Sequence, residues 1–207
     1  EEVIENDGGG VYGYDTSSVV EDCIISNNAA YRGGGSLRGR IYNSVYRNCR
    51  ALYGGGGASD VYAYGCLAHD NYSATAGQYA GFFYFYHLEN CTALDGAGNM
   101  NARYTDAKVI NCLFAGRTYK EAAMTADNTA NCIFNSAYIV NASAFDGYTG
   151  VKVVGADLLR MENLRPVPGF NAAVDAASAE AATYAASEVD ALGGQRVYNG
   201  EIDIGCG

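Results

Sequence analysis

"VINCLFAG", residues 109–116, places an Asn-Cys pair in front of two bulky apolar residues, and the pair recurs in "LENCTALDG" upstream and "TANCIFNSA" downstream. Six cysteines follow one rhythm, with separations of 26, 17, 25, 21 and 20 residues, close to 22 on average. The residue two positions after each of them is apolar, which is the periodicity of a strand with one buried face. The predicted cysteine column consists of Cys23, Cys49, Cys66, Cys91, Cys112 and Cys132.

Glycine clusters punctuate the same period, at residues 8–10, 33–35 and 54–57. Strands and turns that repeat about every 22 residues, without a helical pattern, are typical of a β-solenoid. The uneven separations favour a right-handed helix whose loops vary in length between coils. The sequence therefore predicts an all-β fold, a right-handed parallel β-helix of about seven coils over residues 1–155.

In a solenoid of this kind, equivalent residues of successive coils stack on one another. A cysteine is small and apolar enough for an inward column. The preceding Asn suits a bend, because Asn tolerates the left-handed conformation and its amide can bond to the next coil. Stacked cysteines have parallel Cβ vectors, which is poor disulfide geometry. We expect buried free thiols, and a disulfide framework is the alternative.

The rhythm stops after Cys132, and residues 156–207 are predicted to form a closing element. Residues 171–192 are rich in alanine and acidic residues, which favours either a helix or an irregular loop along the last coils. The tail "GGQRVYNGEIDIGCG" predicts a glycine turn followed by two strands joined by a turn.

Two stretches here, "DLLRMENLRPVPGFNAAVDAAS" and "SEVDALGGQRVYNGEIDIG", resemble the ending of many secreted bacterial right-handed β-helix proteins, the choice-of-anchor domain of type Q. That ending contains an Asp-Ala-Gly-like element, Asp-x-x-Gly-x-x-Arg, and a final Asp-Ile-Gly-Ala-Tyr-Glu. The resemblance implies secretion or display on a bacterial surface, and it implies no activity. The matching positions are Asp175, Asp190, Gly193 or Gly194, Arg196, Asp203, Ile204 and Gly205, whereas Ala177 replaces a usual glycine and Cys206-Gly207 replaces Ala-Tyr-Glu.

The charge of the chain limits its partners. A net charge of −10 argues against nucleic acid, whose phosphates require a basic face. The sequence has no apolar run long enough for a membrane-spanning helix. A polysaccharide or a host or cell-surface glycan is the partner we expect, together with self-association through the N-terminal coil.

An enzymatic hypothesis depends on charged residues that lie upstream of the cysteines in neighbouring coils. Polysaccharide lyases on this fold need a basic residue beside carboxylates, which neutralise a uronate through Ca²⁺. The same pattern is typical of a solvated face, so we favour a non-catalytic role. The candidate residues are Arg38, Arg40, Arg103, Lys108, Asp60, Asp106 and Asp127.

Tyrosines supply the candidate binding residues, since aromatic faces can stack on sugars and can also stack on one another as a structural column. His69 and His87 have no partner that the sequence signals, and we expect half-buried packing. We expect no metal site; the only Ca²⁺ candidates are Asp175, Asp190 and Asp203, which more often fix turns. The predicted tyrosine column consists of Tyr14, Tyr42, Tyr62, Tyr84 and Tyr104.

Three functions follow from this pattern. The favoured one is a non-catalytic structural or adhesive protein that is secreted or displayed on a cell surface and binds glycan. The first alternative is a carbohydrate-active enzyme, a lyase before a hydrolase. The second alternative is a fibre subunit that assembles end to end.

Overall fold

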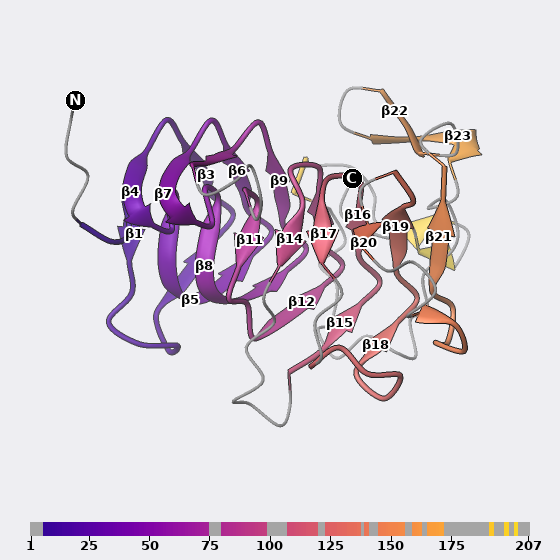
Figure 1. Cartoon of the computed structure of the whole chain (residues 1–207). Coiled ribbons are helices and arrows are strands. Elements are labelled where there is room, and N and C mark those ends of the chain that lie inside the picture. The colour runs from indigo at the N-terminus through magenta and orange to yellow at the C-terminus, as the bar shows by residue number, and fades with distance from the viewer. Residues whose placement is uncertain are drawn as a thin grey trace.

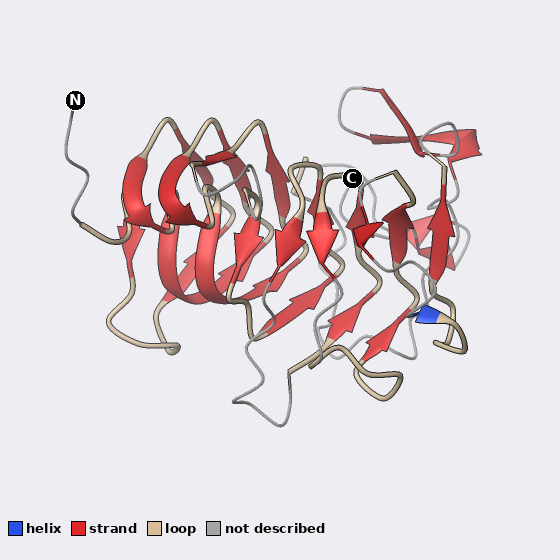
Figure 2. Cartoon of the chain, in the orientation of Figure 1, coloured by secondary structure: helices blue, strands red, loops and turns tan. Residues whose placement is uncertain are grey.

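The chain folds into a parallel β-solenoid of about 5 turns (Figure 1). The computed structural model describes residues 6–74, 80–98, 107–119, 123–137, 139–140, 145–155, 159–162, 165–171, 191–192, 197–198 and 201–202. Nearly all regular structure in these residues is strand (Figure 2). The predicted all-β solenoid is confirmed, whereas its hand, its seven coils and its boundary at residue 155 stay predictions.

Three parallel sheets form the walls of the solenoid. Sheet A consists of β1 (Val11–Tyr12), β2 (Val19–Glu21), β5 (Ser36–Tyr42), β8 (Ala58–Tyr64), β11 (Phe82–Phe83), β12 (His87–Glu89), β14 (Ala97–Gly98), β15 (Val109–Ile110) and β18 (Thr129–Ala130). Sheet B consists of β3 (Ile24–Ser26), β6 (Val45–Arg47), β9 (Leu67–His69), β13 (Thr92–Ala93), β16 (Leu113–Phe114), β19 (Ile133–Asn135) and β21 (Lys152–Val154). Sheet C consists of β4 (Ala29–Arg32), β7 (Arg50–Gly54) and β10 (Tyr72–Ser73).

Shorter pairings complete the described chain. The strands β17 (Thr118–Tyr119) and β20 (Ile139–Val140) pair in parallel. Two antiparallel hairpins follow the coils: β22 (Leu159–Glu162) with β23 (Arg165–Asn171), and β24 (Val197–Tyr198) with β25 (Glu201–Ile202). The second pair agrees with the two strands predicted in the tail, and the turn predicted between them lies outside the described residues. No helix in the described segments has the length and apolarity needed to cross a membrane.

The corner between sheets A and B is a column of residues in the left-handed conformation. Asparagine and aspartate tolerate a positive φ better than other non-glycine residues, which explains their recurrence here. The strand register stacks one such residue per coil, with φ between 44° and 63°. The corner column consists of Asp22, Asn43, Gly65, Asn90, Asn111 and Asn131.

The register places Ser44, and not Cys49, in line with the other cysteines. Ile24 pairs with Val45, and Val45 with Leu67, so the residues directly before these three share one position. These residues are Cys23, Ser44 and Cys66. Cys49 instead follows Asn48 at the corner between sheets B and C, where its backbone N–H donates to Asn71 Oδ1 at 3.0 Å. The separations of 26 and 17 residues arose because two different corners were counted as one.

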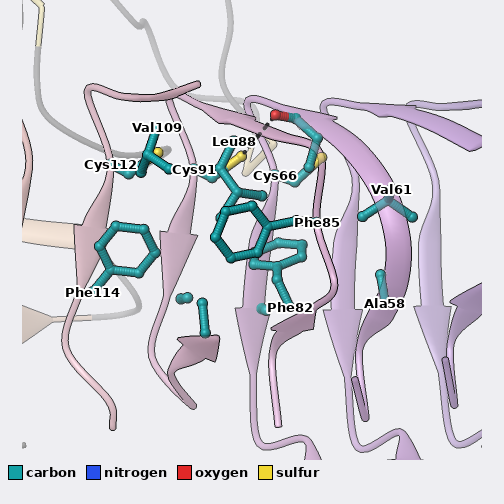
Figure 3. Close-up of a cluster of buried hydrophobic side chains, with 14 of the residues drawn as sticks. Ala58, Val61, Cys66, Phe82, Phe85, Leu88, Cys91, Val109, Cys112 and Phe114 are labelled. Carbon is teal, nitrogen blue, oxygen red and sulfur yellow. Dashed lines mark hydrogen bonds between the residues drawn. The ribbon is translucent and has the colours of Figure 1, made fainter. Parts of the chain in front are cut away.

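The interior of the solenoid is narrow and closely packed (Figure 3). Cysteines of successive coils lie in it beside large side chains such as Phe82 and Leu88. Further along, the rings of Phe114 and Phe134 stack with centroids 5.0 Å apart. A third corner needs glycine, because a Cβ on Gly57 would lie 2.6 Å from the carbonyl oxygen of Gly81 in the next coil. The close approach of successive coils therefore limits side-chain size at this glycine corner as well as in the interior.

One buried amide in the corner column lacks a partner. Asn111 Nδ2 donates to Asn90 Oδ1 of the preceding coil at 3.2 Å. Asn90 Nδ2 is buried and has no hydrogen-bond partner in the described part of the chain. The residue one coil before it is Gly65, which has no side chain to accept the bond.

We predict that Gly65→Asn stabilises the fold by about 1 kcal/mol, because the new Oδ1 would accept from Asn90 and asparagine tolerates the positive φ. Gly65→Ala is the matched control, and it should destabilise by about 1 kcal/mol since it adds strain without an acceptor. Urea unfolding of the three proteins measures both effects. Equal losses for Asn and Ala would show that the amide column contributes nothing.

A second prediction compares two members of one column. Cys112 is buried, whereas Cys23 is exposed in the first coil. Cys112→Asp should cost several kcal/mol, on the order of 3 or more, because it buries an unpaired carboxylate, whereas Cys23→Asp should cost less than about 1 kcal/mol. Thermal melts of both variants check this. Similar losses would contradict the assigned burial.

Candidate functional site

The outer face of sheet A carries a buried cluster of tyrosines. The rings of Tyr42 and Tyr64 stack with centroids 5.1 Å apart and planes 12° apart. Tyr62 packs against Tyr86, and the Arg40 guanidinium lies 4.5 Å from the Tyr62 ring centroid. Burial raises the pKa of Tyr64 to about 12. These rings pack against protein, so they have little free surface for a ligand.

Both histidines have carboxylate partners. His87 Nε2 lies 3.1 Å from Glu89 Oε2, and the two side chains are 7% and 0% exposed. His69 Nδ1 lies 2.8 Å from Asp70 Oδ2. His87 and Glu89 are two residues apart on β12, so they point to the same face. That spacing was the sequence signal for a pair that we did not predict.

The predicted tyrosine column divides among separate places. Tyr42 pairs with Tyr64, while Tyr62 is in register with His87. Tyr84 continues a different position, in line with Asp60. Tyr14 lies between β1 and β2 and is 87% exposed. Tyr104 lies outside the described residues.

Exposed aromatic side chains gather instead on sheet C. Tyr31, Tyr53 and Tyr72 come from successive strands β4, β7 and β10 and are 43%, 39% and 50% exposed. The rings of Tyr31 and Tyr53 lie 6.0 Å apart with planes 10° apart. The Arg50 guanidinium lies 5.6 Å from the Tyr72 ring centroid. We call Tyr31, Tyr53 and Tyr72 the aromatic strip. A tyrosine just before a glycine cluster, in "YRGGG" and "YGGGG", was the sequence signal for the first two.

A polar cluster of Asp7, Arg32, Asp60 and Tyr84 adjoins the strip. Arg32 donates to Asp7 through Nη2 at 2.7 Å and Nε at 3.4 Å, and these bonds raise the pKa of Arg32. Arg32 Nη1 lies 3.9 Å from Asp60 Oδ2, and burial raises the pKa of Asp60. Tyr84 hydrogen-bonds to Tyr53, which joins the cluster to the strip.

The lyase candidates do not form one group among the described residues. Arg38 and Asp60 occupy neighbouring positions on β5 and β8, and Arg38 Nη1 lies 3.3 Å from the Tyr12 hydroxyl. Lys108 is in register with His87. Asp127 is exposed in a turn between Met124 and β18. Arg103 and Asp106 lie outside the described residues.

The described residues hold no group of three His, Cys, Asp or Glu side chains that could bind a metal ion. The Ca²⁺ candidates Asp175, Asp190 and Asp203 lie outside those residues, so they stay predictions. The six described cysteines are free. Burial holds the pKa of Cys112 well above its usual value, which keeps it a neutral thiol.

Comparisons of the chain with protein families, with curated proteins and with solved structures found no match. The choice-of-anchor ending and the secretion that it implies therefore stay predictions. Of that ending, only short strands and residues 191–192 are described. Ala191 and Leu192 pack against Val45 and Leu67 on the outer face of sheet B.

We predict that Cys23 alone among the six described cysteines reacts with a thiol reagent in the native protein, since the other five are buried. The experiment uses Cys206→Ser, because Cys206 lies outside the described residues. Mass spectrometry should find one label in buffer and six after denaturation without reductant. Fewer than six labels on the denatured chain would reveal a disulfide and contradict free thiols in the column.

Proposed function

We propose that this protein is a non-catalytic, structural or adhesive β-solenoid that is secreted or displayed on a bacterial surface, and that its aromatic strip binds glycan. The observation that supports the proposal is the contrast between two faces. Tyr62, Tyr64 and Tyr86 in the cluster on sheet A are 4%, 8% and 8% exposed, whereas the tyrosines of the strip are 43%, 39% and 50% exposed. Exposed tyrosines in consecutive coils give a surface that a linear chain can follow.

The chemistry of the strip suits a sugar chain. Each exposed tyrosine presents an apolar ring edge and a hydroxyl group that can donate and accept a hydrogen bond. A sugar chain has the same alternation of C–H and O–H groups. Successive coils of a parallel sheet rise by about 4.8 Å, so Tyr31 and Tyr53 repeat one contact along the solenoid axis. Tyr72 extends the surface sideways, because it is in register with Arg50, three residues before Tyr53.

The charge of the chain favours a neutral glycan. The net charge is −10, which repels uronate and sulfate groups. Two basic residues adjoin the strip: Arg32 is already paired with Asp7, and the Arg50 guanidinium lies against the Tyr72 ring. The lyase alternative needs a base that faces a uronate beside carboxylates. The described charged candidates divide between the Arg38–Asp60 column, the column that holds Arg40 and Lys108, and the turn at Asp127.

The test is calorimetric titration with cellohexaose, xylohexaose and mannohexaose. We expect at least one to bind with a dissociation constant near or below about 1 mM, roughly −4 kcal/mol. Tyr31→Ala and Tyr53→Ala should each weaken that binding at least about fivefold, or roughly 1 kcal/mol. Tyr14→Ala is the matched control, an exposed tyrosine outside the strip, and should bind like the wild type.

Two results would contradict the proposal: no binding of any neutral hexasaccharide, or binding that Tyr53→Ala leaves unchanged. Release of unsaturated products from a polyuronate, with loss of that activity in Arg103→Ala or Lys108→Ala, would establish the lyase alternative instead.

A further inference from the structure

Three non-glycine residues near the aromatic strip have a positive φ, which strains the backbone. Arg38, Asp60 and Tyr84 have φ values of 61°, 56° and 49° and stack in register on β5, β8 and directly after β11. Glycine would adopt this conformation without strain, whereas other residues do so at a cost. Non-glycine residues in this region are concentrated at functional sites. The corner columns use asparagine, aspartate and glycine for this conformation, so Arg38 and Tyr84 make this column the exception.

Asp60 and Arg32 have unused hydrogen-bonding groups that face each other. Arg32 bonds to Asp7 through Nε and Nη2, which leaves Nη1 without a hydrogen bond among the described residues. Asp60 accepts one bond, from the Ser59 hydroxyl to Oδ2 at 3.2 Å. The separation of 3.9 Å between Arg32 Nη1 and Asp60 Oδ2 is too long for a hydrogen bond. Both side chains are partly exposed, at 31% and 15%.

A hydroxyl group fits this arrangement, because it can accept from Nη1 and donate to the carboxylate at once. A carboxylate ligand fits poorly, because Asp60 would repel it and Asp7 already neutralises Arg32. Tyr84 hydrogen-bonds to Tyr53 and interacts electrostatically with Asp60 and Arg32. The gap between Arg32 Nη1 and Asp60 Oδ2 therefore lies beside the strip.

We propose that Arg32 and Asp60 form the hydrogen-bonding part of the glycan site and select a neutral sugar through one of its hydroxyl groups. This proposal rests on the proposed glycan binding by the aromatic strip. It assigns the strip to apolar contact with the chain and the Arg32–Asp60 gap to sugar selection.

The test compares affinity with stability in two variants of one residue. The probe is whichever neutral hexasaccharide the wild type binds, with hexagalacturonate as the anionic comparison. Asp60→Asn should bind the neutral probe about tenfold more weakly, since it removes the charged acceptor. Asp60→Gly should bind as weakly or worse, yet melt at or above the wild-type temperature because it relieves the positive φ. Asp146→Asn, an exposed carboxylate away from the strip, is the matched control and should bind like the wild type.

The wild type should also prefer the neutral probe to hexagalacturonate at least about tenfold, and Asp60→Asn should narrow that preference. Wild-type affinity in Asp60→Asn, together with lost affinity in Tyr53→Ala, would overturn this assignment and leave the proposed function standing. Loss of binding in Asp60→Gly that is matched by a lower melting temperature would also overturn it, because the role would then be structural. Absence of neutral glycan binding in the wild type would remove both proposals.

Discussion

The in-register stacking of one coil on the next is the constraint on which the whole molecule depends. Backbone N–H groups of each coil donate to carbonyl groups of a neighbouring coil, as Asn43 N donates to Tyr64 O at 2.9 Å. Coils about 4.8 Å apart fix the neighbours of each side chain, because each residue stacks between the equivalent residues of the coils on either side. Residue size at the glycine corner and backbone conformation at the asparagine corner both follow from that spacing.

The same constraint creates columns with different environments on one wall. Inward positions bury cysteine and phenylalanine, and the outward positions of sheet A bury tyrosine and the His87–Glu89 pair. Only sheet C leaves a run of tyrosines exposed beside a polar cluster in the described residues. A single repeated residue type thus has a packing role in one column and a contact role in another, and the strand register decides between them.

The fold could be predicted from the sequence because a strand repeat with a small inward residue is compatible with few folds besides a solenoid. The register could not, since Asn43-Ser44 and Asn48-Cys49 are both good corner sequences and only the pairing of Ile24 with Val45 chooses between them. The stacking partners of the tyrosines could not be predicted for a related reason. Tyr42 and Tyr62 are an even number of residues apart and belong to different coils, so spacing alone could not assign them to one column or to two. Strand periodicity could have predicted that His87 and Glu89 share one face, because they are two residues apart on one strand.

The register is the central claim, because it places Tyr31 against Tyr53 and Asp60 near Arg32. Nuclear Overhauser contacts in an isotope-labelled sample test it most directly. We expect contacts from Ser44 to both Cys23 and Cys66, and from the ring of Tyr31 to that of Tyr53. Contacts from Cys49 to Cys23 and Cys66, with none from Ser44, would show that the cysteines form one column and that the assigned register is wrong.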